Sequence, residues 1–212
     1  MFRVTDLTRQ LNADSLSYPG DQPALRIDRI DVGDPTCLVS KLTHLDLHGG
    51  THIDAPLHFI SGGIDVAALP LQLFPTVFVE TRCHPIGSGD LPEQVVGCAV
   101  LFSTGWERHQ DTPEFFSGYP HLTTEAAQAL VGRGAALVGL DTPSADPVEE
   151  PYDFPVHKIL LQAGIPIVEA LCNLPWLRQA VGQIWFGCFP LRIKSVEASP
   201  VRAVALTARD TA

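Results

Sequence analysis

The stretch from position 44 to 59, HLDLHGGTHIDAPLHF, constrains the fold more than any other part of the chain. His48, His52, Asp54 and His58 are separated there by four, two and four residues. Because side chains two apart point to the same face of a strand, an extended segment would carry all four on one face. A helix would turn Asp54 well away from the histidines, since each residue advances by about 100°. The spacing therefore predicts an extended segment rather than a helix.

The residue types in this stretch point to a metal centre. Imidazole nitrogens with a carboxylate are the ligands of catalytic zinc and related divalent ions. Gly49 and Gly50 allow the backbone to bend between the first two ligands, and Pro56 fixes a turn before His58. A solvated strand face would explain any one of the histidines alone. Half of the eight histidines lie between positions 44 and 58, interleaved with Gly, Thr and Pro, which favours the metal centre.

A second pair of candidate ligands lies further along the chain. His157 falls in a segment of helical character, and Glu169 follows in the apolar run GIPIVEAL. A carboxylate in such a run needs a metal or another cation as a partner, unless it turns to solvent at the end of a strand.

Charge and composition narrow the kind of partner. The formal net charge is −10, so the chain lacks the basic stripe that nucleic acids and anionic membranes require. No apolar stretch reaches the roughly 18 to 20 residues of a membrane span, and the N-terminus lacks the apolar core of a signal peptide. We therefore expect a cytoplasmic protein that binds a small molecule. Its five cysteines lack CxxC spacing, which favours free, buried thiols.

The pattern of apolar residues predicts an α/β fold in which one domain spans positions 1–212. Five strands are expected, at 24–30, 76–81, 97–104, 136–141 and 201–207, and two helices, at 123–134 and 154–164. Thr123 or Thr124 can cap the first helix, and Gly164 can end the second. The strand, helix, strand order between 97 and 168 predicts βα units on a mixed sheet flanked by helices.

The string HGGTHIDAPLH resembles the HxGTHxDxPxH signature of the cyclase family of metal-dependent hydrolases, which includes bacterial kynurenine formamidases and isatin hydrolases. The resemblance runs through the whole chain. Four more segments are similar to family segments: YPGD at 18–21, GLDTPSAD at 139–146, HKILLQAGIPIVEALCNL at 157–174 and SPVRAVAL at 199–206.

The resemblance implies a swivelling β/β/α domain that assembles into dimers or tetramers, with one or two zinc or manganese ions per subunit. It implies that His48, His52 and Asp54 hold a first ion, and that Asp54 bridges to a second. The second ion would be held by His157 and Glu169, His58 would act in proton transfer, and Tyr18 would contact the substrate.

Two departures from the formamidase pattern bear on the substrate. The chain reads LHGGTH around the first ligand, where kynurenine formamidases resemble PHTGAH, and it has Tyr18 in place of a Trp. Phe59 and Trp106 are further candidates to line a pocket for a planar substrate, although core packing would explain both.

The resulting hypothesis is hydrolysis of a small-molecule amide by metal-activated water, with His58 carrying the proton. The substrate would be an arylformamide such as N-formylkynurenine, or a cyclic amide or imide. Two alternatives stay open. One is a lactone hydrolase or a cyclase that uses the same metal site, and the other is a catalytically inert metal-binding protein whose ion is closed by four ligands.

Overall fold

The computed structural model describes residues 2–15, 17, 23–148 and 153–208. Its strands and helices follow the chain in this order: β1 (Phe2–Asp6), β2 (Leu25–Ile30), β3 (Val39–Leu45), β4 (His52–Asp54), β5 (Phe74–Glu80), β6 (Ala99–Ser103), α1 (Thr124–Gly132), β7 (Leu137–Leu140), α2 (Pro155–Gln162), β8 (Ile167–Glu169), β9 (Ile184–Pro190) and β10 (Ala198–Ala208). Short 3-10 helices lie between them at Pro56–His58, Val66–Ala68, Ser88–Asp90, Trp106–His109, Pro113–Phe116 and Leu174–Gln179.

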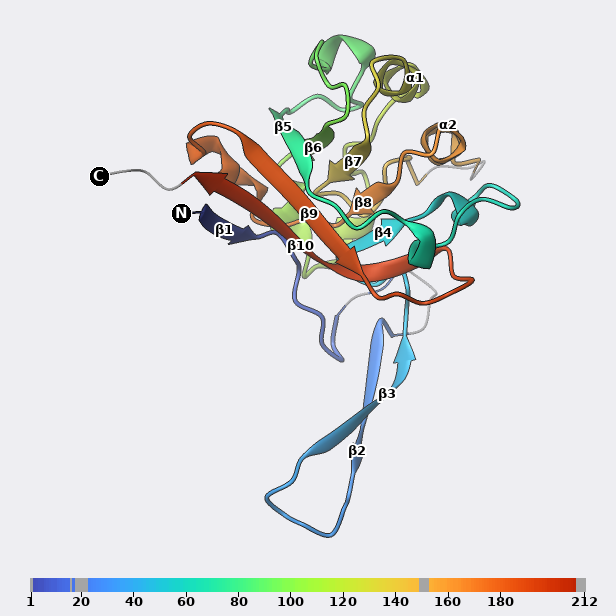
Figure 1. The fold of residues 1–212 in the computed structure, drawn as a ribbon, viewed down its shortest axis with the longest axis vertical. Coiled ribbons are helices and arrows are strands. Elements are labelled where there is room, and N and C mark those ends of the chain that lie inside the picture. The colour runs from blue at the N-terminus through green and yellow to red at the C-terminus, as the bar shows by residue number, and fades with distance from the viewer. Residues whose placement is uncertain (1, 16, 18–22, 149–152, 209–212) are drawn as a thin grey trace.

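A mixed sheet forms the body of the molecule (Figure 1). In the described part of the chain its strand order is β1-β10-β4-β8-β7-β6-β5-β9, and β9 also pairs with β10. The pairings β5–β6, β6–β7 and β7–β8 are parallel. Every pairing that involves β1, β4, β9 or β10 is antiparallel. The second pairing of β9 closes the sheet on itself, as in a small barrel. The predicted mixed sheet with βα units is confirmed.

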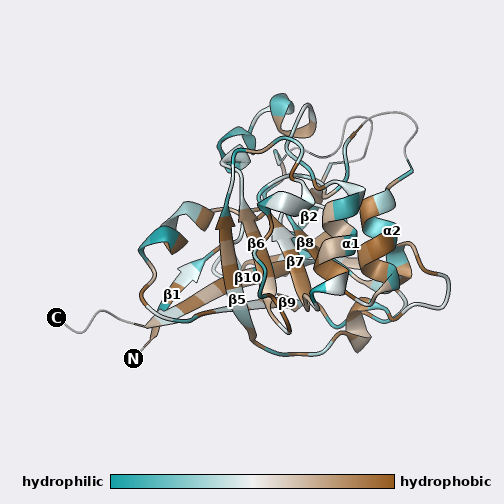
Figure 2. Cartoon of the chain, turned by 90° about the horizontal axis from the view of Figure 1, so that it is seen from above, coloured by the Kyte–Doolittle hydropathy of each residue, from teal (hydrophilic) through white to brown (hydrophobic). Residues whose placement is uncertain are grey.

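Two apolar clusters lie on opposite faces of this sheet. Every second residue along the strands packs inside the closed ring, for example Ile53, Leu101, Val168 and Phe186. On the other face the side chains between them pack against α1 and α2, which both cover that face. Figure 2 shows the apolar strands β6 and β7 beside the apolar sides of the two helices. The period of two along each strand thus separates an interior face from a helix-covered face.

Both predicted helices form, one or two residues shorter at their ends than expected. The Thr123 hydroxyl accepts a hydrogen bond from the Ala126 N–H at 3.1 Å and caps α1. Helix α2 begins at Pro155 and ends before Gly164, whose φ of +76° is the left-handed conformation that glycine adopts after a helix. No helix within the described ranges is long and apolar enough to cross a membrane.

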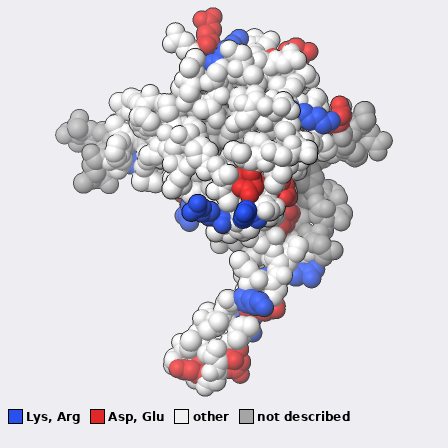
Figure 3. Space-filling view, turned by 45° about the vertical axis from the view of Figure 1, so that its right-hand side comes forward, with Lys and Arg blue, Asp and Glu red and all other residues white. Residues whose placement is uncertain are grey.

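Strands β2 and β3 form a separate two-stranded hairpin that stands clear of the body (Figures 1 and 3). Its apolar side chains are strongly exposed, with Leu38 at 74% and Leu42 at 55%. Ile27 lies directly opposite Leu42 in the antiparallel pairing.

All five cysteines are free thiols, as predicted. Their predicted burial is wrong for four of them, because only Cys188, on β9, is fully buried and Cys37, in the loop between β2 and β3, is exposed.

Candidate metal centre

Six predicted site residues converge on the helix-covered face of the sheet, at the end of β4. They come from five local structures: His48 from the turn after β3, His52 and Asp54 from β4, His58 from a 3-10 helix, His157 from the first turn of α2, and Glu169 from the end of β8. The prediction of one extended segment from 48 to 58 is therefore wrong beyond residues 52–54. The expected bends are confirmed, because Gly50 has a φ of +66° and Pro56 begins the 3-10 helix that carries His58.

The register of β4 and β8 sets the centre of the cluster. His52 lies directly opposite Glu169 in the antiparallel pair, so their side chains share one face. Asp54, two residues on, shares that face, while Ile53 points into the interior cluster. The alternation predicted from the sequence thus holds over the three residues of β4.

The imidazole nitrogens lie close to two buried carboxylates. His48 Nδ1 is 3.2 Å from Asp54 Oδ1, and His157 Nε2 is 3.4 Å from Asp54 Oδ2. His157 Nε2 and His52 Nε2 lie 3.2 and 3.4 Å from the two oxygens of Glu169. The side chains of His52, Asp54, His157 and Glu169 are all 5% exposed or less.

Hydrogen bonds on the far side of two rings fix which nitrogen faces the cluster. His52 Nδ1 lies 2.9 Å from the carbonyl oxygen of Gly50, which can only accept a proton. His157 Nδ1 lies 2.6 Å from Asp146 Oδ2. Both rings therefore carry hydrogen on Nδ1, and each presents Nε2 to the carboxylates.

In neutral rings of this tautomer, lone pairs on Nε2 would face lone pairs on carboxylate oxygens. Within the described residues, neither oxygen of Asp54 has a hydrogen-bond partner, although both are buried. Such an arrangement is stable only when protons or a cation lie between the acceptors. This is the ligand geometry that a divalent ion would satisfy, so the residues present fit a metal.

The close approach of these charged groups also shifts their pKa values. Burial disfavours the charged form of His52, but Asp54 and Glu169 outweigh it and raise the pKa of His52 to about 9. The pKa of His157 is likewise raised well above its ordinary value by Glu169, Asp146 and Asp54, against the effect of burial. Burial alone would raise the pKa of Asp54, yet the surrounding histidines hold it well below its usual range.

Two overlapping sets of three could each hold an ion with ligand atoms less than 4.8 Å apart: His52 with Asp54 and Glu169, and His48 with Asp54 and His58. Asp54 belongs to both sets, but His157 is in neither, and His48 and His52, expected to share one ion, fall in different sets. The second set brings His58 within ligand distance, in addition to the proton-transfer role expected from the sequence.

His58 lies at the rim of the cluster. Its ring centre is 4.6 Å from that of His48 and 5.9 Å from that of His157, and the side chain is half-buried. Burial lowers its pKa. Phe59 packs against both His58 and His157, at 4.4 and 5.3 Å between ring centres, and also against the apolar cluster under the helices, which is the core packing allowed for in the sequence analysis.

Comparison with known proteins gives this geometry a context. The Cyclase family model matches residues 5–147, about two thirds of the chain. The chain belongs to the Cyclase family.

Individual relatives align with nearly the whole of this chain. It is 32% identical over 203 residues to a kynurenine formamidase of Bacillus thuringiensis subsp. konkukian, covering 94% of this chain and 95% of that enzyme. A solved structure described as a potential metal-dependent hydrolase with cyclase activity superposes with a TM-score of 0.80 at 25% identity, over 99% of this chain and all of the other. An isatin hydrolase bound to the product analogue thioisatinate has the same fold, with a TM-score of 0.83 at 22% identity, over 98% and 93% of the two chains.

Asp146 supports the centre without belonging to it. In the sequence it ends the segment GLDTPSAD at 139–146, after a predicted strand. In the structure its carboxylate accepts hydrogen bonds from the backbone N–H groups of Val156 and His157, at 2.9 and 2.8 Å, and from the His157 ring. Asp146 therefore caps α2 and orients His157 at the same time.

Neither of the two remaining aromatic candidates for a substrate pocket, Tyr18 and Trp106, is placed at the metal centre by the described residues. Tyr18 lies outside the described residues. Trp106 is absent from the cluster: its indole N–H donates to the Phe115 carbonyl oxygen at 2.9 Å, and its ring packs on His109. Trp106 is therefore a packing residue.

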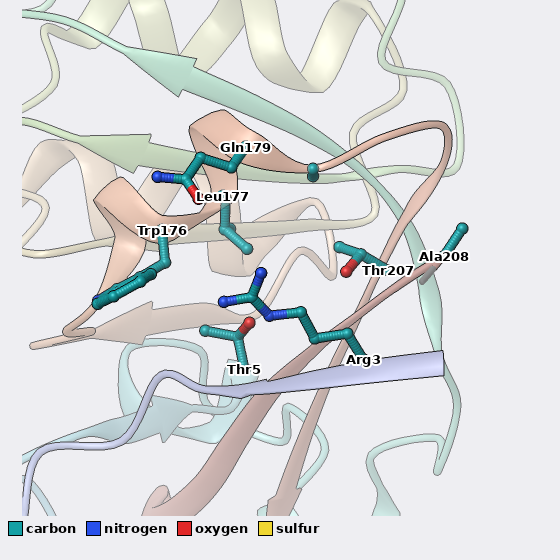
Figure 4. Close-up of a pocket in the computed structure, with 8 residues that line it drawn as sticks. Arg3, Thr5, Trp176, Leu177, Gln179, Thr207 and Ala208 are labelled. Atoms are coloured by element: carbon teal, nitrogen blue, oxygen red, sulfur yellow. The ribbon is translucent and has the colours of Figure 1, made fainter. Parts of the chain in front are cut away.

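Two surface pockets lie away from the candidate metal centre. Figure 4 shows one of about 340 Å³, where Arg3 extends between Thr5 and Trp176 beside the ends of β1 and β10. The other, of about 620 Å³, is apolar and lies behind β4, where Ile53 lines it. Neither is lined by a histidine or a carboxylate of the cluster.

Proposed function

We propose that this member of the Cyclase family is a metal-dependent hydrolase that cleaves an amide bond of a small molecule. The observation that carries the proposal is the buried meeting of Nε2 atoms of His52 and His157 with the carboxylates of Asp54 and Glu169. Catalytic metal sites combine such ligands with an open position. The entire chain, from β1 to β10, would act as one domain, since those two strands pair with each other.

In this proposal His48, His52 and Asp54 would hold one divalent ion, zinc or manganese, and Asp54, His157 and Glu169 would hold a second. A divalent ion bound by these residues would lower the pKa of water toward about 7 and polarise a carbonyl group. The donor set does not favour one of the two metals, because imidazole and carboxylate suit both.

The chain itself supplies orientation and proton transfer. Asp146 fixes the His157 ring, and the Gly50 carbonyl fixes the His52 ring, so both present Nε2 without rearrangement. His58 stands beside the ligands at the half-exposed rim, where it can accept a proton from water and pass it to the leaving nitrogen. The Phe59 ring packs against one side of His58.

The names of the relatives support an amide substrate. A kynurenine formamidase and an isatin hydrolase act on an open-chain formamide and a cyclic amide, respectively, which are the two substrate classes inferred from the sequence. A cyclase or lactone hydrolase is the second candidate, since one similar structure is described as having cyclase activity. The surplus of six convergent groups counts against an inert site closed by four ligands.

Elemental analysis and chelation test the proposal directly. The purified protein should contain a divalent ion and hydrolyse N-formylkynurenine, and removal of the ion should reduce the rate by more than 100-fold, because water at pH 7 is a poor nucleophile without it. Re-addition of zinc or manganese should restore the rate. Metal without turnover of formamides would move the search to cyclic amides and lactones. A protein that takes up no ion under any reconstitution would contradict the proposal.

We further propose that the chain forms a homo-oligomer through the β2–β3 hairpin. An isolated two-stranded hairpin is at best marginally stable in water, and this one exposes Ile27, Leu38 and Leu42. Light scattering during size-exclusion chromatography should give a multiple of the chain mass, and Leu42→Asp should shift it to the monomer. Lys41→Asp, at the adjacent position on the opposite face, is the matched control. A wild-type monomer would contradict this proposal.

A further inference from the structure

Arg9 is a buried cation that the proposed chemistry does not use. It follows β1, and its side chain is only 6% exposed. The Arg9 backbone N–H donates to the Thr51 hydroxyl at 2.8 Å, and this hydroxyl donates to the Ala170 carbonyl oxygen at 2.6 Å. Thr51 precedes His52 and Ala170 follows Glu169. The backbone of Arg9 is thus tied to both strands that carry the metal centre.

The guanidinium group of Arg9 is poorly satisfied for its burial. One Nη donates to Asp111 at 3.3 Å, but the Asp111 side chain is 95% exposed, so solvent weakens that ion pair. In the described part of the chain, the buried Nε of Arg9 has no hydrogen-bond partner. The group lies 5.5 Å from the centre of the Phe115 ring. A buried guanidinium presents a rigid fork of donors and is costly to leave unpaired.

Arg9 lines the same narrow cleft as two proposed metal ligands. His48, His52, Gly49, Gly50 and Phe115 border this cleft with it. The open volume is about 10 Å³, which is space for one water-sized group. On its other side Arg9 borders a wider hollow of about 430 Å³ that also contains the carboxylates of Glu107 and Asp111. The cleft, beside Arg9, therefore favours a negatively charged group, whereas Glu107 and Asp111 disfavour one in the wider hollow.

We propose that Arg9 binds a carboxylate of the substrate and thereby selects amides that carry a carboxylate close to the scissile bond. One carboxylate oxygen enters the cleft and completes the guanidinium fork, while the rest of the substrate stays outside at the metal centre. The hydrogen bond from guanidinium to carboxylate is charge-assisted, and the planar guanidinium holds its donors in fixed directions that a lysine ammonium does not reproduce. Arg9 is then a specificity-determining residue, and this inference rests on the proposed amide hydrolysis.

Two substrates that differ only in the carboxylate test the role. For 2-formamidobenzoate, Arg9→Gln should raise KM by about tenfold to 100-fold, which is the range for loss of a hydrogen bond between charged groups. For formanilide, which lacks the carboxylate, KM should stay within about twofold. Arg9→Lys should give an intermediate KM for 2-formamidobenzoate alone. Arg202→Gln is the matched control, because Arg202 is an exposed arginine paired with Asp6, and it should change neither KM.

The outcomes separate a binding role from a structural one. Equal losses with both substrates, or no loss with either, would overturn the proposal. A folding defect in Arg9→Gln leaves Arg9→Lys as the deciding variant. If the wild-type protein hydrolyses neither amide, the proposed function fails, yet calorimetric titration with benzoate still tests Arg9. Benzoate binding to the wild-type protein that Arg9→Gln loses supports the carboxylate site, and binding that is absent or unchanged contradicts it.

Discussion

Replacing Asp54 with Asn should remove bound metal and reduce kcat/KM by well over 100-fold. Asp54 is the residue common to both sets of candidate ligands, and its two buried oxygens have no hydrogen-bond partner within the described residues. Asn keeps the shape of the side chain but removes the negative charge that faces His48 and His157. Loss of a single supporting residue outside the ligand shell commonly costs 10-fold to 100-fold in metal affinity, and a bridging ligand should cost more. Elemental analysis after dialysis measures the outcome.

A graded comparison makes this result specific. Asp146→Asn alters a residue that holds the His157 ring but does not face the cluster, so it should weaken metal affinity by about 10-fold to 100-fold without abolishing binding. Asp65→Asn, at the cap of the Val66–Ala68 turn, should leave the metal content unchanged. Circular dichroism checks that each variant is folded. Full metal occupancy in folded Asp54→Asn protein would exclude the bridging role.

The parts of the fold that the sequence predicted are those with a clear local signal. The five predicted strands all form, although the one at 24–30 pairs with β3 in the hairpin and not in the main sheet, and both helices end two residues before a glycine with a positive φ. Strand β4 was predicted only within a longer extended segment, and β8 only as the last strand of the order that ends at 168, because each has three residues, too few to show a period. Strand β9 contains Gly187 and ends at Pro190, two residues that are unfavourable in strands, and tertiary contacts stabilise it: its pairing with β5 and β10 and the burial of Phe186.

The candidate ligands could be predicted because six histidine and carboxylate residues, all of types that bind divalent ions, lie in two segments similar to family segments. Even spacing suggested that His48, His52 and Asp54 would meet, but the reason was only partly right. His52 and Asp54 share a face through strand alternation, whereas His48 and His58 arrive by turns that the neighbouring Gly50 and Pro56 create. The spacing predicted which residues lie together, but bends in the backbone, more than one extended strand, bring them together.

The residues that support the cluster were harder to predict. Asp146 resembles any turn-forming Asp in the sequence, and its contact with His157 spans 11 positions of chain. Arg9 gave no signal, since one arginine near the N-terminus is most simply read as a solvated side chain. Both roles depend on tertiary contacts, which the local sequence does not specify.

Replacing His58 with Ala should reduce kcat by about 100-fold to 10,000-fold while the protein keeps its metal. This is the usual contribution of a general acid–base group. Steady-state kinetics with a formamide and elemental analysis of the same sample measure both quantities. His84→Ala, an exposed histidine outside the cluster, should change neither.

The metal measurement decides between two roles that the geometry allows for His58. Its ring nitrogen lies within ligand distance of His48 and Asp54, so a ligand role predicts that metal and activity fall together. A proton-transfer role predicts that only kcat falls, and that imidazole added to His58→Ala protein restores part of the rate by replacing the missing base. Loss of metal without rescue would place His58 among the ligands, and proton transfer would then require another group.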